Sequence, residues 1–139
     1  MNMLEHTFNT VVDLYDKWRP MYTEELFEDI FKYQEINGNS NVLEIGIGTG
    51  QATLPFLELN CDITAIELGR NLSEFVKRKY KKYDNLNVIN ESFEDFEFVD
   101  KKYDLIYSAT AFHWIPEDIG YKKVYRLLNN NGVFARFAN

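Results

Sequence analysis

The sequence predicts an α/β protein whose core is a doubly wound, mostly parallel sheet with helices on both faces. Short β-favouring runs alternate with amphipathic helical stretches from residue 41 onwards, which is the pattern of successive βαβ units. A run of glycines, Gly46, Gly48 and Gly50, stands directly behind the first apolar run. The length of 139 residues, with 45% apolar and 27% charged residues, suits one globular domain.

A helical segment over residues 1–40 is expected to precede this core, which spans residues 41–139. Apolar residues recur at helical spacing from Leu4 to Trp18, and Pro20 ends or kinks that helix. A second helix is expected to begin near Thr23, because acidic residues follow in its first turn. Its apolar stripe consists of Leu26, Phe27, Ile30, Phe31 and Tyr33.

Five strands and three further helices are expected in the core. The strands are residues 42–46, 61–67, 86–90, 103–109 and 133–138, and the helices are residues 51–59, 71–83 and 117–128. An acidic segment, residues 91–98, follows the third strand, and Asn129–Gly132 forms a turn before the last strand. This alternation predicts right-handed crossovers between parallel strands.

Charge disfavours a nucleic-acid partner. The net charge of −7 opposes a protein that wraps nucleic acid, because such a protein needs a positive surface to displace counterions. The dense basic stretch is expected on the side of its helix opposite the apolar face, where a solvated surface is favoured over a nucleic-acid patch. Its members are Lys77, Arg78, Lys81 and Lys82.

Cysteine and histidine usage argues against a disulfide framework and a metal centre. Cys61 is the single cysteine, which fits a reducing compartment, and His6 and His113 are too few and too far apart for a metal cluster. No run approaches the roughly 18 apolar residues of a membrane span, and the N-terminus does not resemble a signal peptide. We therefore expect a cytoplasmic protein without a metal or a membrane partner.

The glycine run predicts a sharp turn in which a ligand lies against bare backbone, since three positions lack a Cβ. Taken alone, the glycines are also compatible with a structural turn. Gln51 stands where a dinucleotide-binding motif has its third glycine, and no lysine follows as in a phosphate-binding loop. Glu67 ends the next strand, where an acidic group accepts hydrogen bonds from ribose hydroxyls in such folds. Together with Glu44, two residues before Gly46, these features favour a cofactor site.

Five segments resemble, in chain order, the successive motifs of class I S-adenosylmethionine-dependent methyltransferases of the small-molecule type. They are "VLEIGIGTGQ", "ITAIELG", "NVINESFEDF", "YDLIYSATAFHWI" and "LLNNNGVFARF". The resemblance covers residues 41–139 and implies a Rossmann-like fold, S-adenosylmethionine as cofactor, and direct in-line methyl transfer to a small-molecule acceptor. Two alternatives stay open, namely an NAD-type oxidoreductase domain and a non-catalytic or fragmentary cofactor-binding domain.

The resemblance also implies a set of cofactor-binding residues. Gly46 and Gly48 are expected to flank the methionine end of the cofactor, where Glu44 helps position the ammonium group directly or through water. Glu67 is expected to hold both ribose hydroxyls. The remaining members are Gly50, Leu68, Glu91, Ser92 and Phe93, around the turn and the adenine, and Ser108 and Ala109, which face the reacting methyl group. The usual aspartate of the adenine motif is replaced here, so the choice among the three residues 91–93 stays open.

The stretch "LYDKWRPMY" places Tyr15 and Arg19 on one face of the first helix. It resembles the N-terminal lid of small-molecule members of the family, in which a tyrosine and an arginine reach the methionine carboxylate. The alternative is ordinary, with Tyr15 in the core and Arg19 at the helix end, where a cation is favoured.

The loop after the fourth strand, "ATAFHWI", is expected to meet the substrate. Phe112 and Trp114 are predicted substrate-binding residues in an aromatic wall, because ring faces stabilise a sulfonium cation. His113 is the candidate catalytic base, and hydrogen bonding within the loop alone is the alternative. The preceding residues 108–111, Ser-Ala-Thr-Ala, lack the Asn/Asp-Pro-Pro-aromatic signature of enzymes that methylate base amines. This absence argues against that subclass.

Members of the resembled family continue past the fifth strand, in the sheet order 3-2-1-4-5-7-6, whereas this sequence ends at Asn139. We therefore expect the N-terminal portion of a longer domain, or else a short form that covers its edge by forming a homodimer. Phe134 and Phe137 are predicted on opposite faces of this edge strand. An uncovered edge strand is a site for pairing and aggregation.

Overall fold

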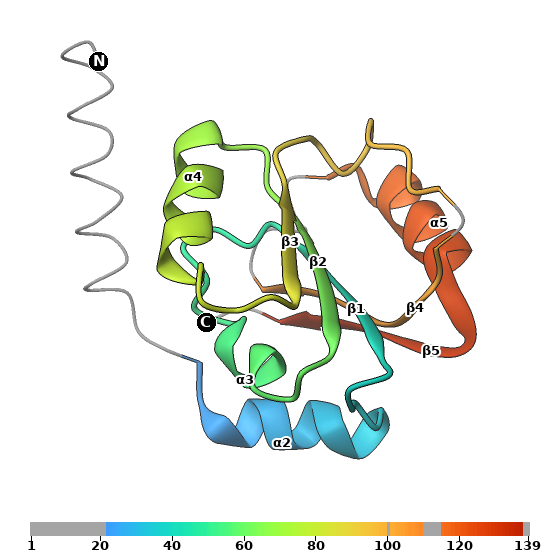
Figure 1. The fold of residues 1–139 in the computed structure, drawn as a ribbon. Coiled ribbons are helices and arrows are strands. Elements are labelled where there is room, and N and C mark those ends of the chain that lie inside the picture. Colours follow the sequence, from blue (N-terminus) through green and yellow to red (C-terminus); the bar gives the residue numbers. More distant parts are fainter. Residues whose placement is uncertain (1–21, 100, 110–114, 138–139) are drawn as a thin grey trace, which may run out of the picture.

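A computed structural model of the protein describes residues 22–99, 101–109 and 115–137 (Figure 1). Its strands are β1 (Asn41–Ile45), β2 (Asp62–Ile66), β3 (Leu86–Ile89), β4 (Tyr103–Ala109) and β5 (Leu128–Phe137). Its helices are α2 (Glu24–Tyr33), α3 (Leu54–Leu57), α4 (Arg70–Lys79) and α5 (Glu117–Leu127). The expected helix from Leu4 to Trp18 lies outside the described residues.

The strands form one parallel sheet in the order β3-β2-β1-β4-β5. This confirms the predicted α/β fold, and the order is the one expected for the first five strands. The chain runs from β1 outwards to β3 and then returns to β4 on the other side of β1. The direction of winding therefore reverses between β1 and β4, where ligands collect outside the carboxyl ends of strands.

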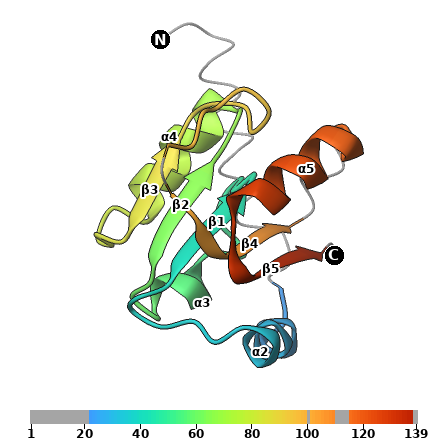
Figure 2. The ribbon, with the colours of Figure 1, turned by 90° about the vertical axis from the view of Figure 1, so that its right-hand side faces the viewer.

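Helices cover both faces of the sheet (Figure 2). One core lies beneath α2, α3 and α4 and includes Phe27, Phe56 and Val76. The other core lies beneath α5 and includes Val124 and Leu127. Both faces of the central strands are apolar, as expected for a parallel sheet buried on two sides.

Helix α2 begins as predicted. The side chain of Thr23 accepts a hydrogen bond from the Leu26 N–H, and two acidic residues follow in the first turn. Phe27 and Ile30 are buried against the sheet. Tyr33 was expected in the same stripe but is 81% exposed. Tyr33 is the last residue of the helix and lies at the margin of the stripe, outside both cores formed by the described residues.

Helices α3 and α4 are shorter than predicted. Residues 51–59 were expected to be helical, but α3 contains only Leu54–Leu57. The chain makes two tight turns before this helix. In the first, the Gly50 N–H donates to the carbonyl oxygen of Ile47, and in the second, the Thr53 N–H donates to the carbonyl oxygen of Gly50. Helix α4 ends at Lys79 instead of residue 83. Tyr80 leaves the helical conformation, and a turn follows.

Strand β5 begins five residues earlier than predicted. Leu128 pairs with Tyr103 and Val133 pairs with Leu105, so residues 129–132 bulge out opposite one residue of β4. The predicted turn is therefore a bulge within the strand. Gly132 is required there, since a Cβ would lie 2.8 Å from the Tyr103 carbonyl oxygen. As predicted, Phe134 and Phe137 lie on opposite faces of the sheet: Phe134 packs against the core beneath α5, and Phe137 packs against the core beneath α2.

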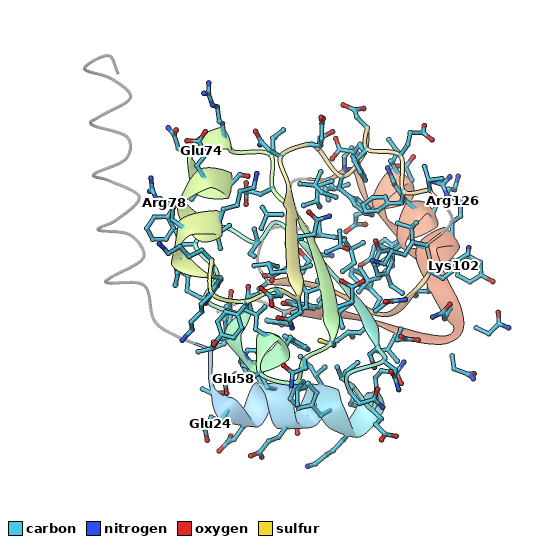
Figure 3. All side chains as sticks on the ribbon, viewed as in Figure 1. Glu24, Glu58, Glu74, Arg78, Lys102 and Arg126 are labelled. Carbon is cyan, nitrogen blue, oxygen red and sulfur yellow. The ribbon has the colours of Figure 1, made fainter. Side chains whose placement is uncertain are left out.

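The basic stretch lies on the solvent side of α4 and the turn after it. Lys77, Arg78, Lys81 and Lys82 are exposed, and Figure 3 shows Arg78 pointing away from the sheet. Among the described residues, no three metal-ligating side chains gather into a possible ion site. In the same part of the chain, no helix has the length and apolar character that crossing a membrane requires.

Candidate functional site

The candidate site is built where β1, β2 and β4 end side by side. The turn that begins at Gly46 follows β1, Glu67 follows β2, and Ser108 and Ala109 end β4. The Gly46 N–H donates to the carbonyl oxygen of Ile66 at 2.8 Å, and the Ser108 hydroxyl donates to the carbonyl oxygen of Ile45 at 3.0 Å. The sheet order thus brings together residues from three separate sequence motifs.

The three glycines of the turn all have a positive φ, which is unfavourable for residues with a Cβ. The values are 74° for Gly46, 59° for Gly48 and 85° for Gly50. A Cβ on Gly50 would lie 2.6 Å from the Tyr80 ring, so this glycine allows α4 to pack closely. A Cβ on Gly48 would have no atom of the described residues within 4 Å. Gly48 therefore presents open, bare backbone of the kind that a ligand can cover.

Glu67 fixes the position of this open backbone. One carboxylate oxygen accepts the Gly48 N–H at 2.8 Å, and the other accepts the Gly69 N–H at 2.8 Å. Each oxygen retains a further lone pair for a ligand hydroxyl. Because Glu67 is only 8% exposed, its side chain is well ordered by packing before any ligand arrives. The carboxylate thus stands beside the glycine turn, as the sequence predicted.

Helix α4 holds the same turn from the other side. The Tyr80 hydroxyl donates to the Gly50 carbonyl oxygen at 2.6 Å, and the Lys79 ammonium donates to the Thr49 carbonyl oxygen at 2.8 Å. The turn is therefore held through both its N–H groups and its carbonyl groups. Sequence reasoning did not select Lys79 or Tyr80, because their role depends on how α4 packs.

Glu44 lies beneath the turn and is 1% exposed. The hydroxyls of Tyr107 and Thr53 both donate to one of its carboxyl oxygens, at 2.6 and 2.7 Å. Burial raises the pKa of Glu44 from about 4.5 to about 8, although these two hydrogen bonds oppose the rise and the charge of Glu67 adds to it. A nearby ligand cation would instead favour the ionised carboxylate.

The segment after β3 contains the three candidates for the adenine position, and they differ in environment. Glu91 is exposed, Ser92 is half-buried, and Phe93 is buried in the α5-side core. Leu68, two residues after the end of the neighbouring strand, is 72% exposed.

Asn90 links these two segments and was missed by sequence reasoning. Its side-chain amide donates to the carbonyl oxygens of Glu67 and Leu68, at 2.8 and 3.0 Å. It thereby ties the end of β3 to the end of β2. The available signal was a polar residue at the last position of the predicted strand, residues 86–90.

Five predicted site residues lie outside the described residues. They are Tyr15 and Arg19, from the predicted lid, and Phe112, His113 and Trp114, from the loop after β4. Their roles stay predictions. The described members of the predicted cofactor set lie along the carboxyl edge of the sheet.

The sheet order, with a glycine turn at its switch point and an acidic side chain on the next strand, defines a Rossmann-like cofactor-binding protein. A family described as a methyltransferase domain matches residues 42–132. The chain belongs to this family and is a class I S-adenosylmethionine-dependent methyltransferase by descent. The family predicted from the motifs is confirmed, and an NAD-type oxidoreductase domain is disfavoured.

Similar proteins of known sequence are methyltransferases. An uncharacterized methyltransferase of Schizosaccharomyces pombe is 28% identical over 99% of this chain and 54% of its own length. A malonyl-[acyl-carrier protein] O-methyltransferase of Ilyobacter polytropus is 35% identical over 71% of this chain and 38% of its own length. A ribosomal RNA small subunit methyltransferase of Malacoplasma penetrans is 31% identical over 78% of this chain and 38% of its own length.

Solved structures share the fold. The CcbJ methyltransferase of Streptomyces caelestis superposes with a TM-score of 0.72 at 18% identity, over 89% of this chain and 53% of that one. A glycopeptide N-methyltransferase complexed with S-adenosylmethionine gives a TM-score of 0.70 at 21% identity, over 84% of this chain and 54% of that one. The chain spans about half the length of the curated relatives it matches, between 38% and 54% for the three named above.

Proposed function

We propose that this protein binds S-adenosylmethionine and transfers its methyl group directly, in line, to a small-molecule acceptor. The observation that carries the cofactor assignment is the open backbone at Gly48, held by the carboxylate of Glu67. A side chain at Gly48 would fill space that nothing in the described part of the protein occupies within 4 Å. The residues present therefore fit a ligand that carries ribose hydroxyls and lies against the turn.

Each part of the site has a distinct task in this proposal. Glu67 accepts the ribose hydroxyls with the lone pairs that the Gly48 and Gly69 N–H groups leave available. The exposed side chain of Leu68 covers one face of the adenine. Glu44 favours the ammonium group of the methionine end, because a carboxylate buried at 1% exposure interacts strongly with a nearby cation.

The chemistry of the cofactor sets what the chain has to do. When bound, S-adenosylmethionine supplies a methyl group on a positively charged sulfur, which an acceptor atom can attack without further activation. The chain then has to hold the two reactants in line and keep water out. Ser108 and Ala109, at the end of β4, are the described residues proposed to border this reaction site.

A small molecule is favoured over ribosomal RNA as the acceptor, although relatives of both kinds are known. The net charge of −7 opposes tight association with a polyanion. Residues 108–111, Ser-Ala-Thr-Ala, differ from the Asn/Asp-Pro-Pro-aromatic signature expected of base-amine methylation. The second candidate is a non-catalytic or fragmentary cofactor-binding domain, which would use the same backbone at Gly48 and the same carboxylate of Glu67.

Radiolabelled methyl transfer tests the proposal. The chain is incubated with methyl-labelled S-adenosylmethionine and, separately, with a panel of small carboxylic acids, amines and phenols, and with purified ribosomal RNA. We expect label in at least one small acceptor and none in RNA. Label in RNA alone would overturn the assignment of acceptor class. Cofactor binding without transfer to any acceptor would favour the cofactor-binding domain instead.

A further inference from the structure

The chain after β3 makes a single helical turn over residues 92–96. The Ser92 side chain accepts the Asp95 N–H at 3.1 Å, and the Ser92 carbonyl oxygen accepts the Phe96 N–H at 3.0 Å. Ser92 thus caps the amide end of this turn, next to the predicted adenine position. A lone helical turn is unstable without tertiary support, because nucleation is unfavourable.

Lys123 of α5 supplies that support at the carbonyl end. Its ammonium group donates to the carbonyl oxygens of Phe93, Glu94 and Phe96, the last two at 3.1 and 2.6 Å. The same nitrogen lies 5.1 Å from the ring centre of Phe93 and 5.4 Å from that of Phe98. Three N–H donors therefore meet three carbonyl acceptors between two aromatic rings.

This arrangement requires the charged form of the lysine. A neutral amine has only two N–H donors, so one of the three carbonyl oxygens would lose its partner. The side chain is 8% exposed, and burial lowers its pKa. A buried cation is tolerated only where its donors are satisfied, as they are here. The positive charge also lies at the negative end of the turn, where it is favoured.

We propose that Lys123 is a positioning residue for the cofactor: it fixes the 92–96 turn so that the backbone at Glu91 and Ser92 is held for the adenine. This inference rests on the proposed function. It assigns a cofactor-related role to α5, which contacts the 92–96 turn through Lys123. The neighbouring Lys122 lies on the same helix but is exposed, and among the described residues it donates no hydrogen bond to the 92–96 turn. It therefore offers a matched control.

Calorimetric titration of the full chain tests the inference with two probes, S-adenosylhomocysteine and 5′-deoxy-5′-methylthioadenosine. The second probe carries the adenosine without the amino-acid end. We expect Lys123→Met to lower the affinity for both probes by a similar factor, on the order of tenfold, because both carry the adenine that the turn holds. Lys123→Arg should recover part of the affinity, and Lys122→Met should bind like the unaltered chain.

Hydrogen exchange at the Asp95 and Phe96 amides gives the second readout, and Lys123→Met should accelerate it while the strands stay protected. Accelerated exchange with unchanged affinity for both probes would overturn the inference and leave Lys123 a purely structural residue. A loss confined to S-adenosylhomocysteine would also overturn it, since the amino-acid end would then be responsible. Failure of the unaltered chain to bind either probe would overturn the proposed function itself, which is a different result.

Discussion

At the scale of single residues, Gly48 and Gly50 have different environments although both have a positive φ. Gly50 lies against Tyr80 and Val76, so its missing side chain serves packing. No atom of residues 22–99, 101–109 and 115–137 comes near the missing side chain of Gly48, so we assign this space to a ligand. The spacing of the glycines was readable from the sequence. The division of roles was not, because it depends on where α4 lies.

Gly50→Ala is expected to destabilise the fold. The new Cβ would lie 2.6 Å from the Tyr80 ring and require a φ of 85°, so strain and a displaced ring together should cost about 2 kcal/mol or more. Urea unfolding measures the loss. Gly38→Ala is the control, because its nearest neighbour would be 3.9 Å away. Equal midpoints for the two variants would contradict the packing role of Gly50.

Glu44 is expected to make stability depend on pH. Its pKa is about 8 in the folded chain and about 4.5 when exposed, so between these values the folded chain holds a proton that the unfolded chain has lost. The stabilisation that the protonated Glu44 adds to the folded chain is complete below about pH 4.5, falls as the pH rises, and is lost above about pH 8. Within that window the free energy of unfolding should fall by up to about 1.4 kcal/mol per pH unit.

Urea unfolding of the chain and of Glu44→Gln between pH 5 and pH 9 measures this slope. The glutamine can still accept the hydroxyls of Tyr107 and Thr53 but cannot titrate, so the difference in unfolding free energy between the two proteins should change across the window. A constant difference would show that Glu44 titrates normally in the folded chain.

At the scale of elements, the positions of the strands were predictable where the sequence has a short apolar run between polar boundaries. Strand β4 has the predicted bounds, β1 and β2 differ from theirs by one residue at each end, and β3 ends one residue earlier than predicted. Strand β5 was predicted too short, because its bulge is formed by Asn and Gly residues that normally mark a turn. Long-range contacts stabilise the bulge, and these contacts have no local signature.

Asp104 provides those contacts and should be important for the junction of β1, β4 and β5. Its carboxylate accepts the backbone N–H of Asn41 and the side-chain amide of Asn129, both at 2.8 Å. Its carbonyl oxygen accepts the side-chain amide of Gln34 at 2.7 Å. Loss of the carboxylate leaves two partly buried donors without this acceptor.

We expect Asp104→Ala to lower the free energy of unfolding by about 2 kcal/mol, since each unsatisfied donor costs about 1 kcal/mol or more. Chemical denaturation measures the change. Asp84→Ala, at an exposed position after α4, is the control and should have little effect. Similar small losses for both variants would show that the bulge does not depend on Asp104.

At the scale of the whole molecule, the candidate site could be predicted only in part. The motifs identified the glycine turn and Glu67, because both stand at strand ends in a recognisable order. Lys123 was missed, because it is 30 residues from Phe93 in sequence and meets it only through the packing of α5. Residues that support a site, such as Lys123, reach it through the packing of separate elements. The sequence motifs identify only the residues that line the site.

Strand β5 stands at one edge of the sheet, and association through this edge stays a prediction. Within the described part of the chain, β5 pairs with β4 alone, which leaves its other side for a second copy that extends the sheet. Light scattering across a dilution series should show the average mass increasing with concentration. A constant monomer mass at high concentration would contradict homodimer formation through β5.

The central claim is that S-adenosylmethionine binds against the backbone at Gly48. Calorimetric titration of S-adenosylhomocysteine into the Gly48→Asn variant tests this claim most directly. Asparagine tolerates a positive φ better than other side chains, so the variant should fold, and Gly38→Asn controls for the substitution itself. We predict that Gly48→Asn lowers the affinity by about tenfold or more, whereas Gly38→Asn leaves it unchanged. Undiminished affinity in a folded Gly48→Asn chain would contradict the account.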